Sequence, residues 1–182
     1  LGPLALAAAA FARWDAQRPA AARAAAGVLL ALLTGTTFAR GRAFRGLEEL
    51  WSDTLVKNPG CWMCMSNLGE LRAKEGRPDE AVRLYTRLLE IRPQHFRARN
   101  NLGALLFARG DLTGAEDHLR KALALKPDLA SAHTNLGAVL YKRGRFAESV
   151  AELTVATRLD PASVDARDNL AAARATLAKR RR

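Results

Sequence analysis

The chain has 182 residues, of which 49% are hydrophobic and 26% charged, and this composition excludes an intrinsically disordered protein. Its formal net charge is +11, but basic and acidic side chains are mixed along it, except for a basic run from Lys179 to Arg182. A nucleic-acid-binding domain usually concentrates its basic residues on one face, so we expect no nucleic-acid partner.

Residues 1–45 contain two apolar stretches, residues 1–12 and residues 24–38. The second has 15 residues, which is fewer than the roughly 20 that a spanning helix requires. Residues 20–22 extend it to a marginal span if Arg23 reaches the membrane interface. We expect an apolar helical segment that forms a membrane hairpin or ends a transmembrane region. A degenerate helical unit packed on the following residues and a signal peptide remain alternatives.

Residues 46–61 predict half of a helical unit. Leu50, Trp51 and Leu55 form an apolar stripe at helical spacing, and Pro59 prevents the helix from continuing. We interpret this segment as the second helix of an incomplete hairpin.

From Trp62 onward the sequence repeats with a period of 34 residues. The triplet Asn-Leu-Gly begins at positions 67, 101 and 135, and Asn-Leu-Ala follows at 169. The same spacing separates Gly76, Gly110 and Gly144, and also Pro93, Pro127 and Pro161. A fixed period of this length is typical of stacked helical units.

Each period predicts two helices. In the first unit we expect helices over 62–75 and 79–91, because Gly76 can adopt the left-handed conformation that ends a helix and Pro93 cannot continue one. The next two units predict helices over 96–109, 112–125, 130–143 and 146–159. A last helix over 164–180 is expected to cover the exposed end of the third unit.

Small residues at fixed places predict a close approach of the two helices in each unit. Gly69, Gly103 and Gly137 on the first helices have no side chain, and the matching places on the second helices hold the small residues Ala81, Ala115 and Ser149. The space between the helices is expected to be filled by Leu68, Leu102 and Leu136, with Tyr85, Leu119 and Leu153 opposite.

These positions resemble the tetratricopeptide repeat family, which has small residues at the eighth and twentieth positions, an aromatic residue or Leu at the twenty-fourth and Pro at the thirty-second. The resemblance covers Trp62 to Pro161, and it departs where Met65, Arg99 and His133 replace a frequent Trp. It implies an all-α solenoid of stacked antiparallel helix hairpins. The expected parts are a half repeat at 46–61, three repeats at 62–95, 96–129 and 130–163, and a capping helix with a basic tail at 164–182.

In that family the first helices of the repeats line a concave groove that binds peptides or partner proteins. The residues carried over by position are Asn67, Asn101, Asn135 and Asn169, with Arg97 and Glu70 at variable groove positions. An Asn side chain offers both a donor and an acceptor, so a row of them can pair with successive peptide groups of an extended chain. This is similar to the asparagine ladder of intracellular O-linked N-acetylglucosamine transferases. The alternative is that Asn is an ordinary consensus residue at this position, with its amide bonded to the backbone of a neighbouring repeat.

Cys61 and Cys64 form a Cys-x-x-Cys motif at a predicted helix start. A helix N-terminus favours a thiolate, but no predicted strand precedes the pair, as a thioredoxin-like unit requires. A second cysteine pair for zinc is missing. A structural role, a disulfide in an oxidising compartment and a redox or metal-binding role remain open.

A second resemblance concerns the stretch from Leu50 to Pro59 and the first Asn-Leu-Gly triplet. It resembles the junction between the last transmembrane helix and the repeats in multi-pass membrane O-mannosyltransferase-like proteins. The resemblance implies that the repeats lie on the non-cytoplasmic, periplasmic side, with a cytoplasmic location as the alternative. Catalytic acidic residues lie upstream in that family, and because Leu1 is not Met we expect a fragment or processed form.

The sequence therefore predicts a protein–protein interaction scaffold that residues 1–45 tether to a membrane. Its expected partner is an extended peptide or a partner protein. The alternatives are a non-catalytic, substrate-recruiting tail of a multi-pass membrane glycosyltransferase and a soluble assembly factor. We find no Gly-rich phosphate loop and no nucleophile, histidine and acid arrangement, so we expect no enzyme activity, cofactor or metal site.

Overall fold

The structure of the protein, a computed structural model, describes residues 46–180. The chain divides into two compact units, residues 1–50 and 51–182. The predicted apolar segment over 1–45 lies outside the described residues.

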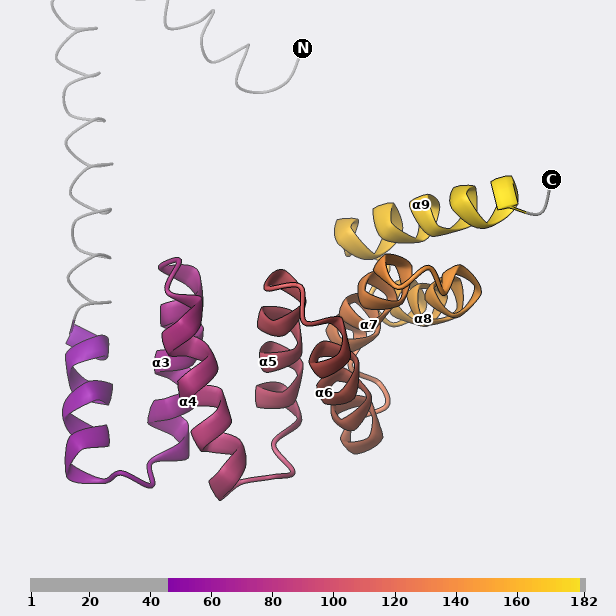
Figure 1. Ribbon diagram of the computed structural model, residues 1–182. Helices are drawn as coiled ribbons and strands as arrows, with labels where there is room; N and C mark the ends of the chain where they lie inside the picture. The colour runs from indigo at the N-terminus through magenta and orange to yellow at the C-terminus, as the bar shows by residue number, and fades with distance from the viewer. Residues whose placement is uncertain (1–45, 181–182) are drawn as a thin grey trace, which may run out of the picture. The chain divides into compact units, whose positions relative to one another are not determined.

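Helices make up all the regular structure between residues 46 and 180, and no strand occurs there (Figure 1). Residues 46–57 are helical. The helices that follow are α3 (Trp62–Lys74), α4 (Pro78–Ile91), α5 (Phe96–Ala108), α6 (Leu112–Leu125), α7 (Ala130–Lys142), α8 (Phe146–Leu159) and α9 (Val164–Arg180). The all-α prediction is confirmed, and each of these helices begins and ends within one residue of its predicted bounds.

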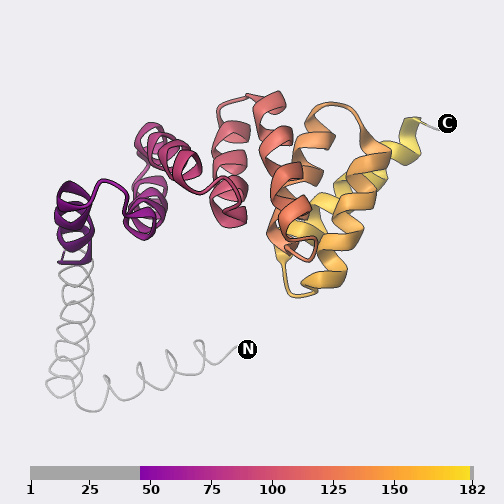
Figure 2. The same cartoon turned by 90° about the horizontal axis from the view of Figure 1, so that it is seen from below.

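Glycine makes the turn inside each hairpin. Gly76, Gly110 and Gly144 have φ values of 73°, 84° and 76° and are the only described residues with positive φ. This left-handed backbone is unfavourable for residues with a Cβ atom, and it reverses the chain directly after α3, α5 and α7. The paired helices α3–α4, α5–α6 and α7–α8 therefore lie side by side (Figure 2).

In each hairpin the glycine of the first helix lies against a large side chain of the second helix, a pairing that the sequence did not predict. A Cβ atom added at Gly69 would lie 2.9 Å from the Tyr85 ring, and one added at Gly103 would lie 2.7 Å from Cγ of Leu119. At Gly137 the same atom would lie 2.5 Å from Cγ of Leu153. These distances are shorter than van der Waals contact, so glycine is what allows the two helices to approach.

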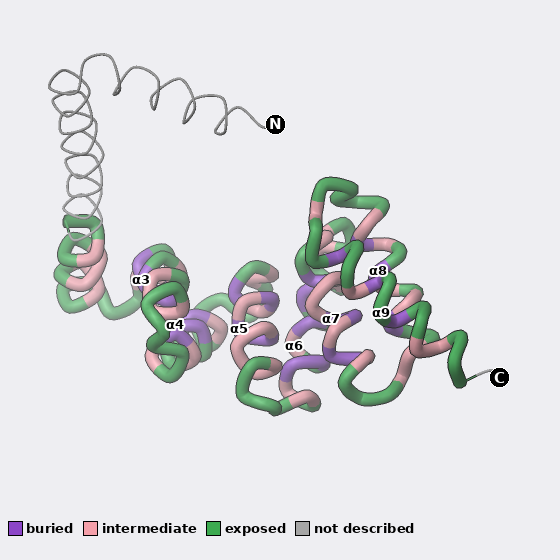
Figure 3. The backbone as a smooth tube through the Cα atoms, turned by 90° about the horizontal axis from the view of Figure 1, so that it is seen from above, coloured by how far each residue is buried: buried purple, intermediate pink, exposed green. Residues whose placement is uncertain are grey.

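Apolar side chains join each hairpin to the next. Met65, Tyr85 and Leu102 belong to one buried cluster that links α3 and α4 to α5, and a second cluster links α6 to α7. Leu170 and Ala173 of α9 pack with Leu153 of α8, while the rest of the α9 surface is mostly exposed (Figure 3). Helix α9 thus covers the last hairpin as a cap does in repeat proteins.

A buried carboxylate also crosses from one hairpin to the next. Glu116 of α6 is 8% exposed and lies 2.8 Å from Arg120, 2.9 Å from Arg143 and 2.7 Å from Arg145. Burial alone would raise the pKa of Glu116, but the hydrogen bonds from Arg120 and Arg145 outweigh it, so this pKa is below its ordinary value of 4.5. Glu116 stays ionised and ties α6 to the turn between α7 and α8.

A histidine caps the middle hairpin. The Nδ1 atom of His95 accepts a hydrogen bond from the backbone N–H of Ala98 at 3.1 Å, which satisfies a free donor at the start of α5. Only an unprotonated Nδ1 can accept this bond. Burial and the charges of Arg92 and Arg97 lower the pKa of His95 below its ordinary value of 6.5.

This cap predicts a loss of stability in mild acid. The unfolded chain binds a proton at His95 more readily than the folded one, so the free energy of unfolding should fall as the pH drops below 6.5. Burial lowers the pKa of His118 in the same direction. Urea unfolding at pH 8 and pH 5 measures the difference, and H95N, which keeps an acceptor that does not titrate, should make it smaller. An H95N protein with the original pH dependence would contradict this account of the cap.

Candidate functional site

A hollow of about 640 Å³ opens between α3, α5 and the start of α7. Its walls come from these first helices of the three hairpins, together with Tyr85 of α4. The lining residues are Glu70, Ala73, Lys74, Tyr85, Arg97, Asn100, Asn101, Ala104, Leu105, Leu129 and Ser131. Ligand clefts have volumes of roughly 300–1,000 Å³, so the hollow has room for a short peptide segment.

A chain of hydrogen-bonded side chains runs from Asn135 to Tyr85, and its members Asn100, Asn101 and Tyr85 form the floor of the hollow. Asn135 donates to Oδ1 of Asn100 at 3.1 Å, and Asn100 donates to Oδ1 of Asn101 at 3.1 Å. Asn101 in turn donates to the hydroxyl of Tyr85 at 3.0 Å. The chain crosses three hairpins and fixes the rotamers of the amides that face the hollow.

The charged groups on the walls are unequally paired. Glu70 and Lys74 form an ion pair at 2.6 Å, with both side chains largely exposed. Arg97 contacts the ring of Phe96 at 5.9 Å and has no carboxylate partner among residues 46–180. The two cations and one anion leave the lining with one positive charge, which favours a neutral or acidic ligand segment.

Tyr85 remains a hydrogen-bond donor at neutral pH. It is 1% exposed, and its burial raises the pKa of the phenol above the ordinary value of 10, against a lowering effect of the Asn101 hydrogen bond. Its hydroxyl accepts from Asn101 and keeps its own proton.

The structure separates the predicted groove residues into two groups. Asn101, Arg97 and Glu70 line the hollow together, whereas Asn67, Asn135 and Asn169 are not among its lining residues. Asn67 is exposed on α3, and Asn169 is half-buried on α9. The row of asparagines therefore does not form one continuous wall of this hollow.

Sequence reasoning missed two members of the site, Asn100 and the hydroxyl of Tyr85. Asn100 is 8% exposed and donates and accepts at the centre of the hydrogen-bonded chain. The other two repeats have Ser66 and Thr134 at the position of Asn100. The longer amide of Asn100 among these shorter hydroxyl side chains was the sequence signal that could have identified it. Asn101 and Asn135 bond side chains of the preceding repeat, Tyr85 and Asn100 respectively, where the predicted alternative named the backbone.

Of the alternatives for the Cys-x-x-Cys motif, the structure contains the disulfide, which joins Cys61 and Cys64. Within the described part of the chain, no group of three or more His, Cys, Asp and Glu residues is placed to hold a metal ion.

Comparison with known families decides the repeat type. The sequence pattern of the tetratricopeptide repeat family matches residues 66–130 and again residues 106–179. These residues are tetratricopeptide repeats. No curated protein matches the chain.

Solved tetratricopeptide-repeat structures share this fold. The first such domain of Spaghetti (RPAP3), bound to the HSP90 peptide SRMEEVD, is 22% identical with a TM-score of 0.62, over 64% of this chain and 93% of that one. MamA is 21% identical with a TM-score of 0.66, over 74% of this chain and 79% of that one. An O-GlcNAc transferase from Thermobaculum terrenum is 30% identical with a TM-score of 0.60, over 62% of this chain but 22% of the transferase.

The membrane expectations receive no support from these comparisons. They do not support the resemblance to the tail of a membrane O-mannosyltransferase. Between residues 46 and 180, every helix is too short or too polar to cross a bilayer. The apolar stretches on which the membrane expectation depends lie outside the described residues.

Proposed function

We propose that this tetratricopeptide-repeat protein binds an extended polypeptide segment in the hollow between α3, α5 and α7. The observation that carries the proposal is the chain from Asn135 to Tyr85, which holds amide and hydroxyl groups in fixed positions at the floor of the hollow. Fixed donors and acceptors lose little entropy when they pair with a peptide backbone. The RPAP3 domain, which was solved with a peptide bound, supports a peptide as the class of ligand.

The proposal distinguishes contacts inside the hollow from contacts along the whole asparagine row. Asn101 and Arg97 line the hollow and should contribute directly to binding. Asn67 occupies the same repeat position as Asn101 but lies outside the hollow. A ladder along all repeats would instead require that Asn67 and Asn101 contribute alike.

The experiment selects peptides from a random library on the full chain and measures their affinity for variants. We expect N101A to weaken binding by about tenfold, which corresponds to about 1.4 kcal/mol, while N67A leaves the affinity unchanged. Far-UV circular dichroism confirms that both variants keep their helices. Equal losses in the two variants would favour the ladder, and no loss in either would exclude this face as the peptide site.

We further propose that residues 1–45 tether the repeats to a membrane, with the repeats on the non-cytoplasmic side. The apolar run over residues 24–38 supports the tether. The Cys61–Cys64 disulfide supports an oxidising compartment, because disulfides persist there. The test compares residues 1–182 with residues 46–182 in detergent-free buffer. A longer form that is monodisperse without detergent would contradict the tether.

A further inference from the structure

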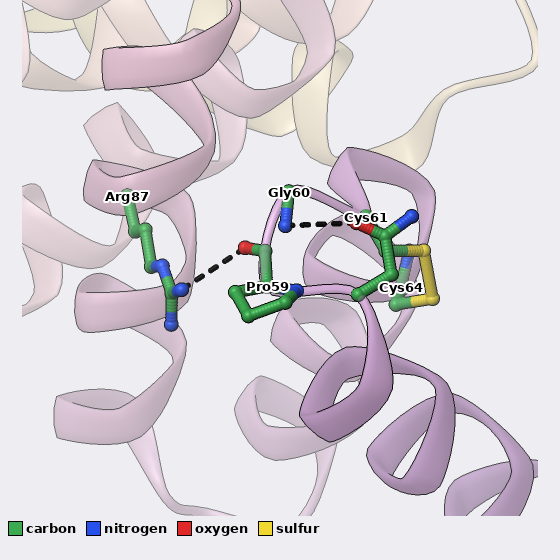
Figure 4. Close-up of a disulfide and its surroundings, with 6 residues drawn as sticks. Pro59, Gly60, Cys61, Cys64 and Arg87 are labelled. Carbon is green, nitrogen blue, oxygen red and sulfur yellow. Dashed lines mark hydrogen bonds between the residues drawn. A yellow bond between two sulfur atoms is a disulfide. The ribbon is translucent and has the colours of Figure 1, made fainter.

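The Cys61–Cys64 disulfide lies at the N-terminus of α3 and differs in exposure between its two ends (Figure 4). Cys61 is the N-cap residue of this 13-residue helix and is partly exposed. Cys64, one turn further along, is 4% exposed and belongs to the core. An attacking group can therefore reach the sulfur of Cys61 more easily than that of Cys64.

The surroundings of Cys61 favour negative charge on its sulfur. The Sγ atom of Cys61 accepts a hydrogen bond from the backbone N–H of Cys64 at 3.2 Å, and the first turn of α3 contains no acidic residue. Arg87 of α4 donates to the carbonyl of Pro59 at 3.0 Å and so holds the loop that precedes Cys61 against α4 (Figure 4). A helix N-terminus stabilises a thiolate.

The disulfide adds little to the stability of the fold. The stabilisation by a disulfide grows with the length of the loop that it closes, and this bond joins residues only three positions apart. Both cysteines are already held by α3, because Cys61 caps the helix and Cys64 packs in its core. A purely stabilising role therefore explains the bond poorly.

We propose that Cys61–Cys64 is a thiol–disulfide exchange site whose substrate is a dithiol carried by another protein or by a small molecule. One thiolate of the dithiol attacks Sγ of Cys61, the Cys61–Cys64 bond breaks, and Cys64 leaves as a thiolate. The second thiolate of the dithiol then attacks the first dithiol sulfur, the bond between that sulfur and Sγ of Cys61 breaks, and Cys61 leaves as a thiolate. The dithiol loses two electrons and becomes a disulfide, the cysteine pair gains them, and the two protons of the dithiol pass to the released thiolates or to solvent.

The released Cys61 thiolate is the better leaving group of the two cysteines. It can keep the N–H of Cys64 as a partner, whereas the Cys64 side chain is buried, and burial disfavours a thiolate. The same asymmetry governs the reverse reaction, in which Cys61 attacks an external disulfide and Cys64 resolves the mixed disulfide.

The first experiment needs no variant. The full chain is reduced with dithiothreitol, freed of reductant and treated at pH 7 with less than one equivalent of iodoacetamide, and peptide mass spectrometry locates the label. We expect about tenfold more label on Cys61 than on Cys64. Equal labelling, or a preference for Cys64, would overturn the proposal.

The second experiment tests the thiolate and the exchange step on C64A, with C61A as the matched control. The rate of reaction with oxidised glutathione should be about tenfold higher for C64A. Its pH midpoint should lie lower for folded C64A than for the same protein in urea, because unfolding removes the helix N-terminus. If the midpoint does not change on unfolding, the helix does not activate Cys61 and the proposal fails. The disulfide-to-dithiol step is checked by incubation of the wild-type chain with dithiothreitol, where resistance to reduction until the chain unfolds also contradicts it.

Discussion

Replacing Gly103 by Ala is expected to lower the free energy of unfolding by about 2 kcal/mol. The new Cβ atom would lie 2.7 Å from Cγ of Leu119 and 3.2 Å from the backbone oxygen of Ala115. The side chain could move, but the backbone oxygen belongs to α6, so relief requires that α5 and α6 separate. Such a separation weakens the packing of the whole middle hairpin. Urea unfolding followed by circular dichroism measures the loss.

Two controls isolate the steric cause. A Cβ atom at Gly60 meets only Oδ1 of Asn58 at 3.5 Å, so G60A should change stability by less than about 0.5 kcal/mol. In an L119A background the main clash is absent, and G103A should then cost much less than in the wild type. An equal cost in both backgrounds would show that helix approach is not the reason for glycine at this position.

The change E116Q is expected to destabilise the protein by about 2 kcal/mol. Glutamine keeps the size of the side chain but removes the charge that Arg120, Arg143 and Arg145 share. The three arginine side chains are 34–46% exposed, so water can solvate them when the charge of Glu116 is removed. The expected destabilisation is therefore smaller than for an ion pair that is fully buried. Because the pKa of Glu116 is lowered, its contribution is present above pH 4.5 and is lost as the pH falls through its folded pKa.

Glu148 provides a matched control for burial. It contacts the same Arg145 at 2.5 Å, but its side chain is 52% exposed against 11% for Glu116. We expect E148Q to lower the free energy of unfolding clearly less than E116Q does, because exposed ion pairs contribute little to stability. Thermal or urea unfolding of the two variants under one buffer condition compares them. Equal costs would mean that the burial of Glu116 has no energetic consequence.

The helices and their turns could be predicted because they depend on local sequence. Gly76 and Pro93 act on the backbone at their own positions, and the close approach at Gly103 involves two helices of one hairpin. Each of these sequence signals occurs in all three repeats, so each prediction was supported three times. Their positions therefore follow from the sequence to within one residue.

The site could be predicted only in part, because it depends on how successive hairpins are displaced against one another. The period placed Asn67, Asn101 and Asn135 in one register, but it did not show that Asn100 would enter the gap between two of them. The bonds of Glu116 to Arg143 and Arg145 cross between repeats in the same way. Contacts between repeats depend on the side-chain lengths at a few positions where the repeats differ. A pattern built from the residues that the repeats share does not describe those positions.

The amides of the hydrogen-bonded chain all donate in the same direction, from Asn135 through Asn100 and Asn101 to Tyr85. Their dipoles add, because each bond polarises the next, and the phenol at the end becomes a stronger donor than an isolated tyrosine. A ligand carbonyl that accepts from the Tyr85 hydroxyl would therefore polarise the hydrogen bonds back to Asn135, two helical hairpins away on α7.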